Sequence, residues 1–171
     1  MNLTAVKARA FWSAALIFVA ADYITKRWAE VHLTPGLAHS IFGNTVRFTL
    51  TWNQSSAMGL FSFGPASRWI FSIIAIAMLW VLAALLREAP AAARWRGAAL
   101  GAVAGGAIGN LIDRVLSARG VTDFIDVGLG HARFWTFNVA DIGVTCGAIL
   151  LALLLWAEER SRTRNRPAEG A

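Results

Sequence analysis

Trp69 to Leu86 (WIFSIIAIAMLWVLAALL) is an uncharged, almost wholly apolar stretch. A bilayer core about 30 Å thick is crossed by a helix of about 20 mostly apolar residues, so this stretch has nearly the length of one span. The whole chain of 171 residues is 57% hydrophobic and only 15% charged, and it contains eight Trp. This composition leaves too little polar surface for a soluble domain of this size, and it predicts a membrane protein.

Three more stretches can span a membrane. Residues 97–112 carry no charge before Asp113, and the chain is apolar again after Asp141 as far as Trp156. Residues 10–21 are short, and with Lys7 and Arg9 before them they also fit a cleavable secretory signal. Apolar residues continue past Asp22, however, and allow a full span. We predict one integral membrane domain, residues 1–171, with spans at about 10–31, 69–87, 97–115 and 139–157.

The distribution of Lys and Arg predicts the orientation. With both termini in the cytoplasm, the inner side holds nine basic and four acidic residues, against seven and six outside. The excess of basic residues on the cytoplasmic side follows the positive-inside rule. Residues 32–68 and 116–138 are then outer segments and residues 158–171 a cytoplasmic tail that anionic lipid attracts. The basic excess therefore requires no nucleic acid partner.

One outer segment has the pattern of a strand. From Thr45 to Trp52, apolar and polar residues alternate, which is the two-residue period of a half-buried strand. Residues 132–137 (ARFWTF) are a second candidate strand, leading to a helix that begins near Asn138. The predicted fold class is an all-α polytopic membrane protein: four transmembrane helices with a small extracytoplasmic β-sheet lying on the membrane surface.

Small residues line one flank of the third span. Gly97, Gly101, Gly105 and Gly109 recur every four residues, and such a flank lets another helix approach closely. The flank leads to a polar group at the outer end of the span. That group consists of Asn110, Asp113 and Arg114, which are within four residues of one another.

Each polar residue also has a purely structural interpretation. Asn138 can cap the last helix, with Asp141 in the favourable field of its amino terminus. Asp113 can form an interfacial salt bridge with Arg114, and Asp22 an ion pair with Lys26 one turn away. Asn53 can close a turn. Those interpretations compete with functional ones, because carboxylates at membrane depth are costly and mark functional sites.

Metal and thiol chemistry have little support in the sequence. The three histidines, His32, His39 and His131, are scattered without the spacing of zinc ligands. The single cysteine, Cys146, lies in the last apolar stretch, where it fits a small buried residue and excludes a disulfide within one chain. We expect no metal and no cofactor.

Five motifs together resemble a known family, the lipoprotein signal peptidases (type II signal peptidases) of bacteria. The motifs are Asp22-Tyr23-Ile24-Thr25-Lys26, Asn53-Gln54-Ser55-Ser56-Ala57-Met58-Gly59, Gly105-Gly106-Ala107-Ile108-Gly109-Asn110-Leu111-Ile112-Asp113-Arg114, Val121-Thr122-Asp123-Phe124 and Phe137-Asn138-Val139-Ala140-Asp141. Their order and spacing agree with the family from about Asp22 to Asp141. Ser55 and Met58 depart from the family's usual glycine and phenylalanine, which concerns the shape of the substrate-facing loop.

The resemblance implies an intramembrane aspartyl endopeptidase. Such an enzyme removes the signal peptide from a prolipoprotein by cutting before a cysteine that carries diacylglycerol. Asp123 and Asp141 would be the catalytic pair, since two nearby carboxylates share a proton and one remains as general base. The matching positions imply substrate binding by Asn53, Asn110, Arg114 and Asn138, and support from Asp22, Lys26 and Asp113.

The resemblance also implies partners and a location. We expect prolipoprotein substrates with diacylglyceryl-cysteine, membrane lipids, the cyclic peptide antibiotics that inhibit the family, and a monomer. The enzyme would lie in the bacterial cytoplasmic (inner) membrane with its active site at the outer leaflet. Two alternatives remain open: a small proton-coupled transporter with an aspartate relay, although no internal repeat is visible, and a noncatalytic assembly factor that binds through the glycine flank.

Overall fold

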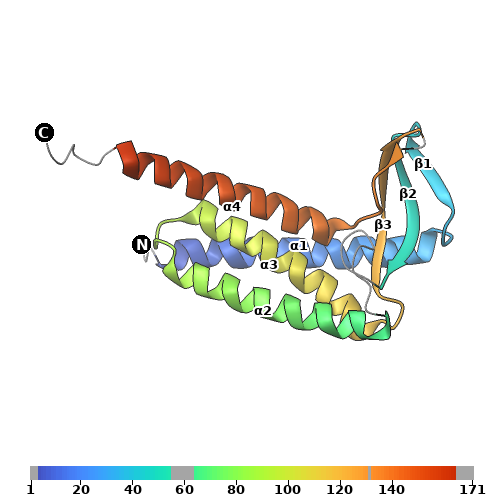
Figure 1. Ribbon diagram of the computed structural model, residues 1–171, viewed down its shortest axis with the longest axis horizontal. Coiled ribbons are helices and arrows are strands. Elements are labelled where there is room, and N and C mark those ends of the chain that lie inside the picture. Colours follow the sequence, from blue (N-terminus) through green and yellow to red (C-terminus); the bar gives the residue numbers. More distant parts are fainter. Residues whose placement is uncertain (1–3, 55–63, 131, 165–171) are drawn as a thin grey trace, which may run out of the picture.

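Four long helices run side by side and form a bundle (Figure 1). They are α1 (Thr4–His32), α2 (Ser67–Glu88), α3 (Arg94–Leu116) and α4 (Val139–Arg164) in a computed structural model that describes residues 4–54, 64–130 and 132–164. Each is long and apolar enough to cross a membrane. The start of α1 and the end of α4 lie at the same end of the bundle, opposite a small sheet. The predicted fold class is confirmed.

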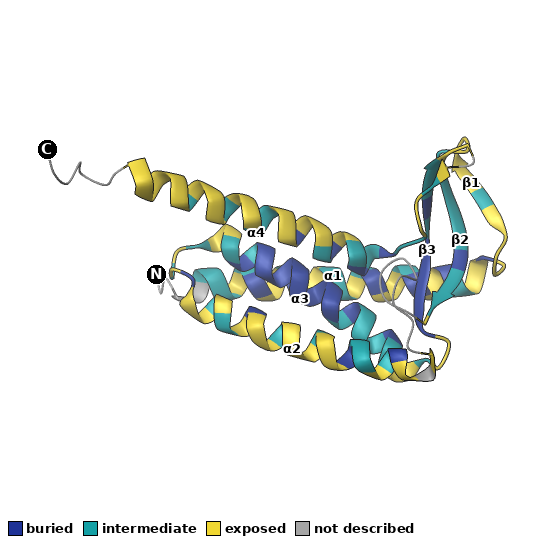
Figure 2. Ribbon diagram, in the orientation of Figure 1, coloured by how far each residue is buried: buried dark blue, intermediate teal, exposed yellow. Residues whose placement is uncertain are grey.

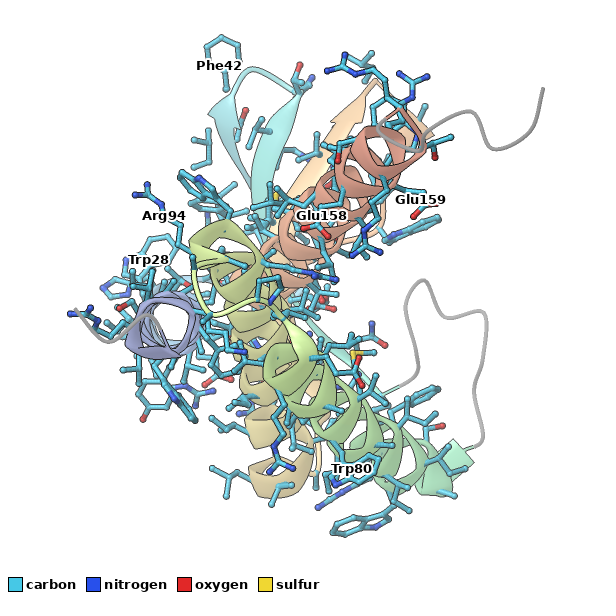
Figure 3. All side chains as sticks on the ribbon, turned by 90° about the vertical axis from the view of Figure 1, so that its left-hand side faces the viewer. Trp28, Phe42, Trp80, Arg94, Glu158 and Glu159 are labelled. Atoms are coloured by element: carbon cyan, nitrogen blue, oxygen red, sulfur yellow. The ribbon has the colours of Figure 1, made fainter. Side chains whose placement is uncertain are left out.

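The helices expose apolar side chains outward. On α2, Trp69 is 55% and Trp80 is 77% exposed, and Trp80 projects away from the bundle (Figure 3). A soluble protein would bury such rings against another element. Large apolar side chains at the periphery are favourable where hydrocarbon surrounds them, as in a lipid bilayer.

The third helix is the centre of the bundle and is buried along most of its length (Figure 2). Gly97, Gly101 and Gly105 lie against the backbone of α1, at Lys7, Phe11 and Ala15. A Cβ atom built on Gly105 would lie 2.6 Å from the Ala15 carbonyl oxygen, which is too close for any side chain. The glycine flank is therefore a helix-packing surface, as its four-residue repeat predicts.

A second face of α3 contacts α4 equally closely. Gly106 lies against the backbone of Ala140. On α4, Cβ atoms built on Gly143 and Gly147 would lie 3.1 Å and 2.8 Å from carbonyl oxygens of α3. Glycine thus brings three helices together backbone to backbone, with α3 between the other two.

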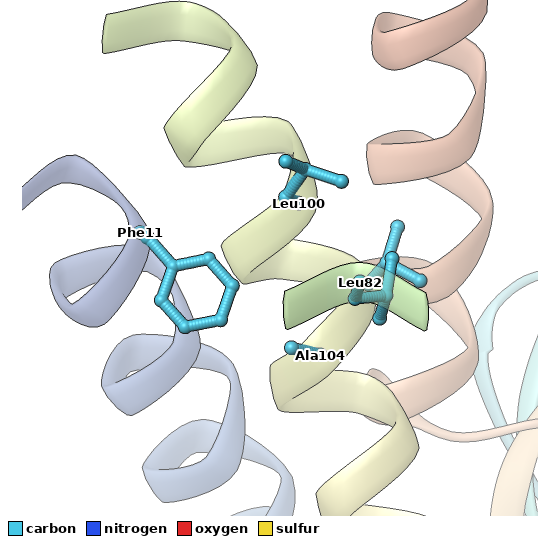
Figure 4. Close-up of a cluster of buried hydrophobic side chains, with 5 residues drawn as sticks. Phe11, Leu82, Leu100 and Ala104 are labelled. Carbon is cyan, nitrogen blue, oxygen red and sulfur yellow. The ribbon is translucent and has the colours of Figure 1, made fainter. Parts of the chain in front are cut away.

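Apolar side chains fill the half of the bundle that lies away from the sheet, where α2 joins the contact. The cluster contains Phe11, Leu82, Leu100, Val103 and Ala104 (Figure 4). At the same end, the Lys7 side chain donates hydrogen bonds to the carbonyl oxygens of Arg87 and Ala89. A cation at the carboxyl end of α2 satisfies free carbonyl groups there and fits the helix dipole.

The sheet is antiparallel and has the order β1-β2-β3-β4. Its strands are β1 (Ala38–Phe42), β2 (Val46–Asn53), β3 (Val121–Leu129) and β4 (Ala132–Arg133). The alternation at 45–52 correctly predicts β2. The second predicted strand, 132–137, is only partly correct: β4 has two residues, and Phe137 forms an isolated bridge with Ile125.

The sheet packs against the carboxyl-terminal end of α1. Leu50 and Phe124 are buried against Ala29 and Leu33, and Phe42 projects from the hairpin between β1 and β2 away from the helices (Figure 3). Between Phe48 and Thr51 the register of β2 against β3 shifts, as in a β-bulge. Bulges bend a strand and are common beside active sites.

Three residues discussed from the sequence are not described by the structure, and two predicted boundaries differ from it. Ser55, Met58 and His131 lie outside the described residues. The last helix continues to Arg164, so the first half of the predicted tail is helical and exposed. The helix α1 is continuous through Ala21, and it begins six residues before the predicted span.

Candidate active site

The amino terminus of α4 is held by two side chains that cap each other. The Asp141 backbone N–H donates to Asn138 Oδ1 at 3.0 Å, and the Asn138 backbone N–H donates to Asp141 Oδ2 at 3.1 Å. This reciprocal arrangement is a capping box, which satisfies two N–H groups that a helix start leaves free. The cap that the sequence predicts is confirmed.

The same two side chains also reach away from the helix. Asn138 Nδ2 donates to Asp123 Oδ1 at 2.6 Å and to Asn110 Oδ1 at 3.0 Å. Asn110 Nδ2 in turn donates to Asp141 Oδ1 at 2.8 Å. The two carboxyl groups are thus joined through two amides, one on α3 and one at the start of α4.

Asp123 lies on β3 and is 3% exposed. Burial and, to a lesser extent, the charge of Asp141 raise the pKa of its carboxyl group to about 7, although hydrogen bonds from Asn138 and Asn53 and the charge of Lys26 act in the opposite direction. Desolvation and a neighbouring like charge both disfavour the ionised form of a carboxyl group. Asp123 is therefore protonated through much of the range below neutral pH.

A buried ammonium group supports this cluster from behind. Lys26 is 1% exposed, and its Nζ lies 2.7 Å from Asp22 Oδ2, 3.0 Å from Asp113 Oδ2 and 2.9 Å from Asn110 Oδ1. All three N–H groups of the ammonium are used. The predicted pair of Asp22 with Lys26 is confirmed. The predicted pair of Asp113 with Arg114 is wrong, because Asp113 contacts Lys26 and, at 3.8 Å, Arg27.

The acids that hold Lys26 also fix backbone near the site. Asp22 Oδ1 accepts a hydrogen bond from the Ala140 N–H at 2.8 Å, beside Asp141. Asp113 Oδ2 accepts one from the Thr122 N–H at 3.0 Å, beside Asp123. Each candidate acid is therefore preceded by a residue whose backbone is anchored to this buried ion cluster.

A cavity of about 590 Å³ opens onto the two acids. Arg114 and Asn53 line it together with Asp123, Asp141 and Asn110. Arg114 also donates to the Asn110 carbonyl oxygen at 3.3 Å, and its charge interacts with both acids. The rest of the wall is mainly apolar and comes from α2, α3, α4 and the segment before α4; it includes Phe71, Ile74, Met78, Phe134, Trp135 and Ile142.

All nine predicted site residues thus meet in one region. Sequence reasoning missed Thr122, whose hydroxyl donates to Glu30 Oε1 at 2.8 Å and whose carbonyl oxygen accepts from Asn138. Its position beside Asp123 was the only available signal. Among the described residues, no group of three or more His, Cys, Asp or Glu side chains is placed to hold a metal ion.

Four spans, a small sheet at one end of the bundle and a buried polar cluster facing an apolar cavity define a multi-pass membrane protein with an enzyme-like site. Comparison with solved structures agrees. A bacterial membrane enzyme determined by the in meso method at 2.3 Å resolution matches with a TM-score of 0.78 and 28% identity, covering 92% of both chains. Another, at 1.9 Å, matches with a TM-score of 0.73 and 31% identity, covering 83% of this chain and 89% of that one.

The family model for signal peptidase (SPase) II matches residues 14–157. The lipoprotein signal peptidase of Hydrogenovibrio crunogenus is 36% identical, with 91% of this chain and 90% of that protein covered. That of Mycobacterium leprae is 37% identical, with 85% and 71% covered. The chain belongs to the signal peptidase II family of membrane proteases, the lipoprotein signal peptidases.

Proposed function

We propose that the protein removes signal peptides from prolipoproteins, and that Asp123 and Asp141 perform the cleavage. The observation that carries this proposal is the pair of acids in one cavity, coupled through Asn138 and Asn110. Family membership favours a protease over the proton-coupled transporter and the assembly factor.

The surroundings of the two acids suggest different roles. Asp141 accepts two N–H hydrogen bonds, from Asn110 and from the Asn138 backbone, and this environment suits a carboxylate. Asp141 would then be the general base that activates water. Asp123, whose pKa is raised to about 7, would donate its proton to the oxygen of the scissile carbonyl.

The polar side chains around the acids would bind the substrate peptide. Asn53 and Arg114 line the cavity beside the acids and can hydrogen-bond a peptide backbone. Asn110 and Asn138 would orient the acids. Lys26, Asp22 and Asp113 would support them from behind, since their contacts are with Asn110 and with backbone rather than with the cavity.

The apolar wall of the cavity supports the proposal that the cysteine of the substrate carries diacylglycerol. Ile74, Met78 and Ile142 line the cavity between helices that expose apolar surface to the bilayer. Acyl chains could therefore remain in hydrocarbon while the peptide bond reaches the acids. The active site would lie at the outer leaflet, with both termini in the cytoplasm, and one chain would be sufficient because both acids belong to it.

A cleavage assay tests the proposal. Wild-type protein, Asp123→Asn and Asp141→Asn are purified in detergent and incubated with a diacylated precursor and with the same precursor lacking the lipid. We expect each variant to lose at least about 100-fold in rate, and the unlipidated precursor to be a poor substrate. Glu158→Gln is the matched control, because Glu158 is an acid on α4 that pairs with Arg96 at 3.4 Å. Normal cleavage by either Asp variant would overturn the pair.

A further inference from the structure

Another buried acid, Asp126, lies three residues after Asp123 on the same strand. Asp126 is 5% exposed, and both of its carboxylate oxygens are occupied. Oδ1 accepts from Arg133 Nε at 2.9 Å and Nη2 at 2.7 Å. Oδ2 accepts from Arg47 Nε at 3.0 Å, Arg47 Nη2 at 2.8 Å and Thr49 Oγ1 at 3.2 Å. The mechanism proposed above makes no use of this group.

The contacts of Asp126 join three strands. Arg47 and Thr49 belong to β2, Asp126 to β3 and Arg133 to β4. Arg133 also donates to the backbone carbonyl oxygens of Asp126 and Asn44, so it ties the edge strand to the hairpin between β1 and β2. Two-nitrogen contacts from each guanidinium fix orientation as well as distance. We refer to Arg47, Asp126 and Arg133 as the arginine clamp.

The arginine clamp holds the start of the segment that leads to α4, at Arg133, against β3. At the other end, the Phe137 carbonyl oxygen accepts from the Phe124 N–H at 3.1 Å and the Ile125 N–H at 2.8 Å. Phe134 N–H donates to the Val127 carbonyl oxygen at 2.8 Å. Between these bonds, Asp126 alone lies opposite two residues, Trp135 and Thr136, which is the count of a β-bulge. Trp135 and Thr136 line the cavity.

We propose that Asp126 is a positioning residue of the peptidase reaction: through the arginine clamp it sets the cavity wall at 134–137 and the start of α4, and hence Asp141, relative to Asp123. The two acids lie on separate elements, and β4 pairs antiparallel with β3 before the chain reaches α4. Their separation therefore depends on how firmly the returning segment is held to β3. Errors in such positioning are expensive, since misplacement by about 1 Å can cost about 100-fold in rate.

The charge of Asp126 is essential to this role. Burial alone would raise the pKa of the Asp126 carboxyl group, but hydrogen bonds from Arg133 and Arg47 outweigh it and lower the pKa below its ordinary value. The group is thus an anion at neutral pH. An asparagine has the same shape, but its NH₂ group would face the N–H donors of one arginine, so one side of the clamp would open.

The test compares Asp126→Asn, Arg133→Met and the double variant with wild type and with Glu158→Gln, using the diacylated precursor. We expect each single change to lower kcat by about tenfold or more with KM within about twofold. The double variant should be no slower than the slower single one, because both changes open the same contact. The pH profile of kcat should also shift by about half a unit or more, since the coupling of the two acids changes with their separation.

A residue that only stabilises the fold gives different results. Unchanged kcat in folded Asp126→Asn, additive losses in the double variant, or a lower thermal midpoint with an unaltered pH profile would each overturn the proposal. If Asp126→Asn does not fold, Arg133→Lys replaces it, because lysine keeps the charge but offers a single donor point. The inference rests on the proposed roles of Asp123 and Asp141, and the failure of those roles would appear separately, as normal cleavage by Asp123→Asn or Asp141→Asn.

Discussion

Asn138 and Asp141 each accept a hydrogen bond from the other's backbone N–H, and each also contacts the opposite candidate acid or its amide partner. Helix cap and active site are therefore one arrangement. A carboxylate at the third helical position is stabilised by the N–H groups of the first turn, yet it lies where a cavity can admit water and substrate.

Two substitutions of Asn138 should separate its two roles. Serine is a good cap and alanine is not, so Asn138→Ser should be more stable than Asn138→Ala by about 1 kcal/mol. Both should lower cleavage to a similar extent, because neither side chain reaches Asp123 and Asn110. Thermal midpoints and cleavage rates of the two variants check this. If the serine variant recovered activity along with stability, the contact with Asp123 would have no part in cleavage.

The rate of cleavage should fall as pH rises through about 7, because Asp123 must hold a proton and its pKa is raised to about 7. Asn53 donates a hydrogen bond that lowers this pKa, so Asn53→Ala should move the alkaline limb to higher pH. The measurement is kcat/KM against pH, which reports on the free enzyme. A limb that stayed in place or moved to lower pH would contradict the assignment.

Replacement of Asp123 by Asn should stabilise the protein while it abolishes activity. The pKa of Asp123 rises from 3.8 to about 7 on folding, so the folded state loses stability as pH rises from 3.8 to about 7, and the loss is constant above that. Asparagine carries no charge and avoids this loss, so Asp123→Asn should be more stable than wild type by up to about 4 kcal/mol at pH well above 7. Thermal midpoints should differ in alkaline buffer and converge in acid. A lower midpoint for Asp123→Asn in alkaline buffer would be inconsistent with a raised pKa.

Lys26→Met should destabilise the fold strongly. Its removal leaves Asp22 and Asp113 buried without their shared cation, and breaking such a cluster costs about 3–5 kcal/mol. The double variant Lys26→Met with Asp22→Asn should regain part of this loss, because one uncompensated charge disappears. The stabilities of the two variants are compared by unfolding curves in detergent solution. Equal stability of the single and double variants would argue against the ion cluster.

Gly101→Ala should destabilise the bundle by about 1–3 kcal/mol, because even a methyl group would meet the backbone of Phe11 on α1. Ala148→Val is the matched control, since Ala148 is exposed on α4 and the added methyl groups face outward. The two variants are compared by thermal midpoint. Equal midpoints would contradict the close backbone contact between α1 and α3 at Gly101.

The sequence predicted well wherever one local pattern decides the outcome. Long apolar stretches mark the four helices, the glycine repeat marks the face of α3 that meets α1, and alternation marks β2. The strand β3 was missed, because its acids at Asp123 and Asp126 interrupt the apolar pattern, and both are held by partners from other elements. Partners of this kind are invisible until the fold brings them together.

The error at Asp113 has a simple geometric cause. Adjacent residues on a helix do not face each other, so Asp113 turns toward α1 and Lys26 while Arg114 lines the cavity. The other site residues were placed through the family resemblance and not from spacing alone. Their contacts, and the separate functions those contacts suggest, required the three-dimensional arrangement.

The glycine contacts of α3 affect how ordered the site is before substrate arrives. Because the helices touch backbone to backbone, side chains as short as Asn110 and Asp22 can bridge them. Short side chains have few rotatable bonds, so little conformational entropy is lost when they are held in place. A bundle with ordinary side chains between its helices would need long, mobile residues for the same bridges. Close packing of the helices thus makes a stiff site with small amino acids.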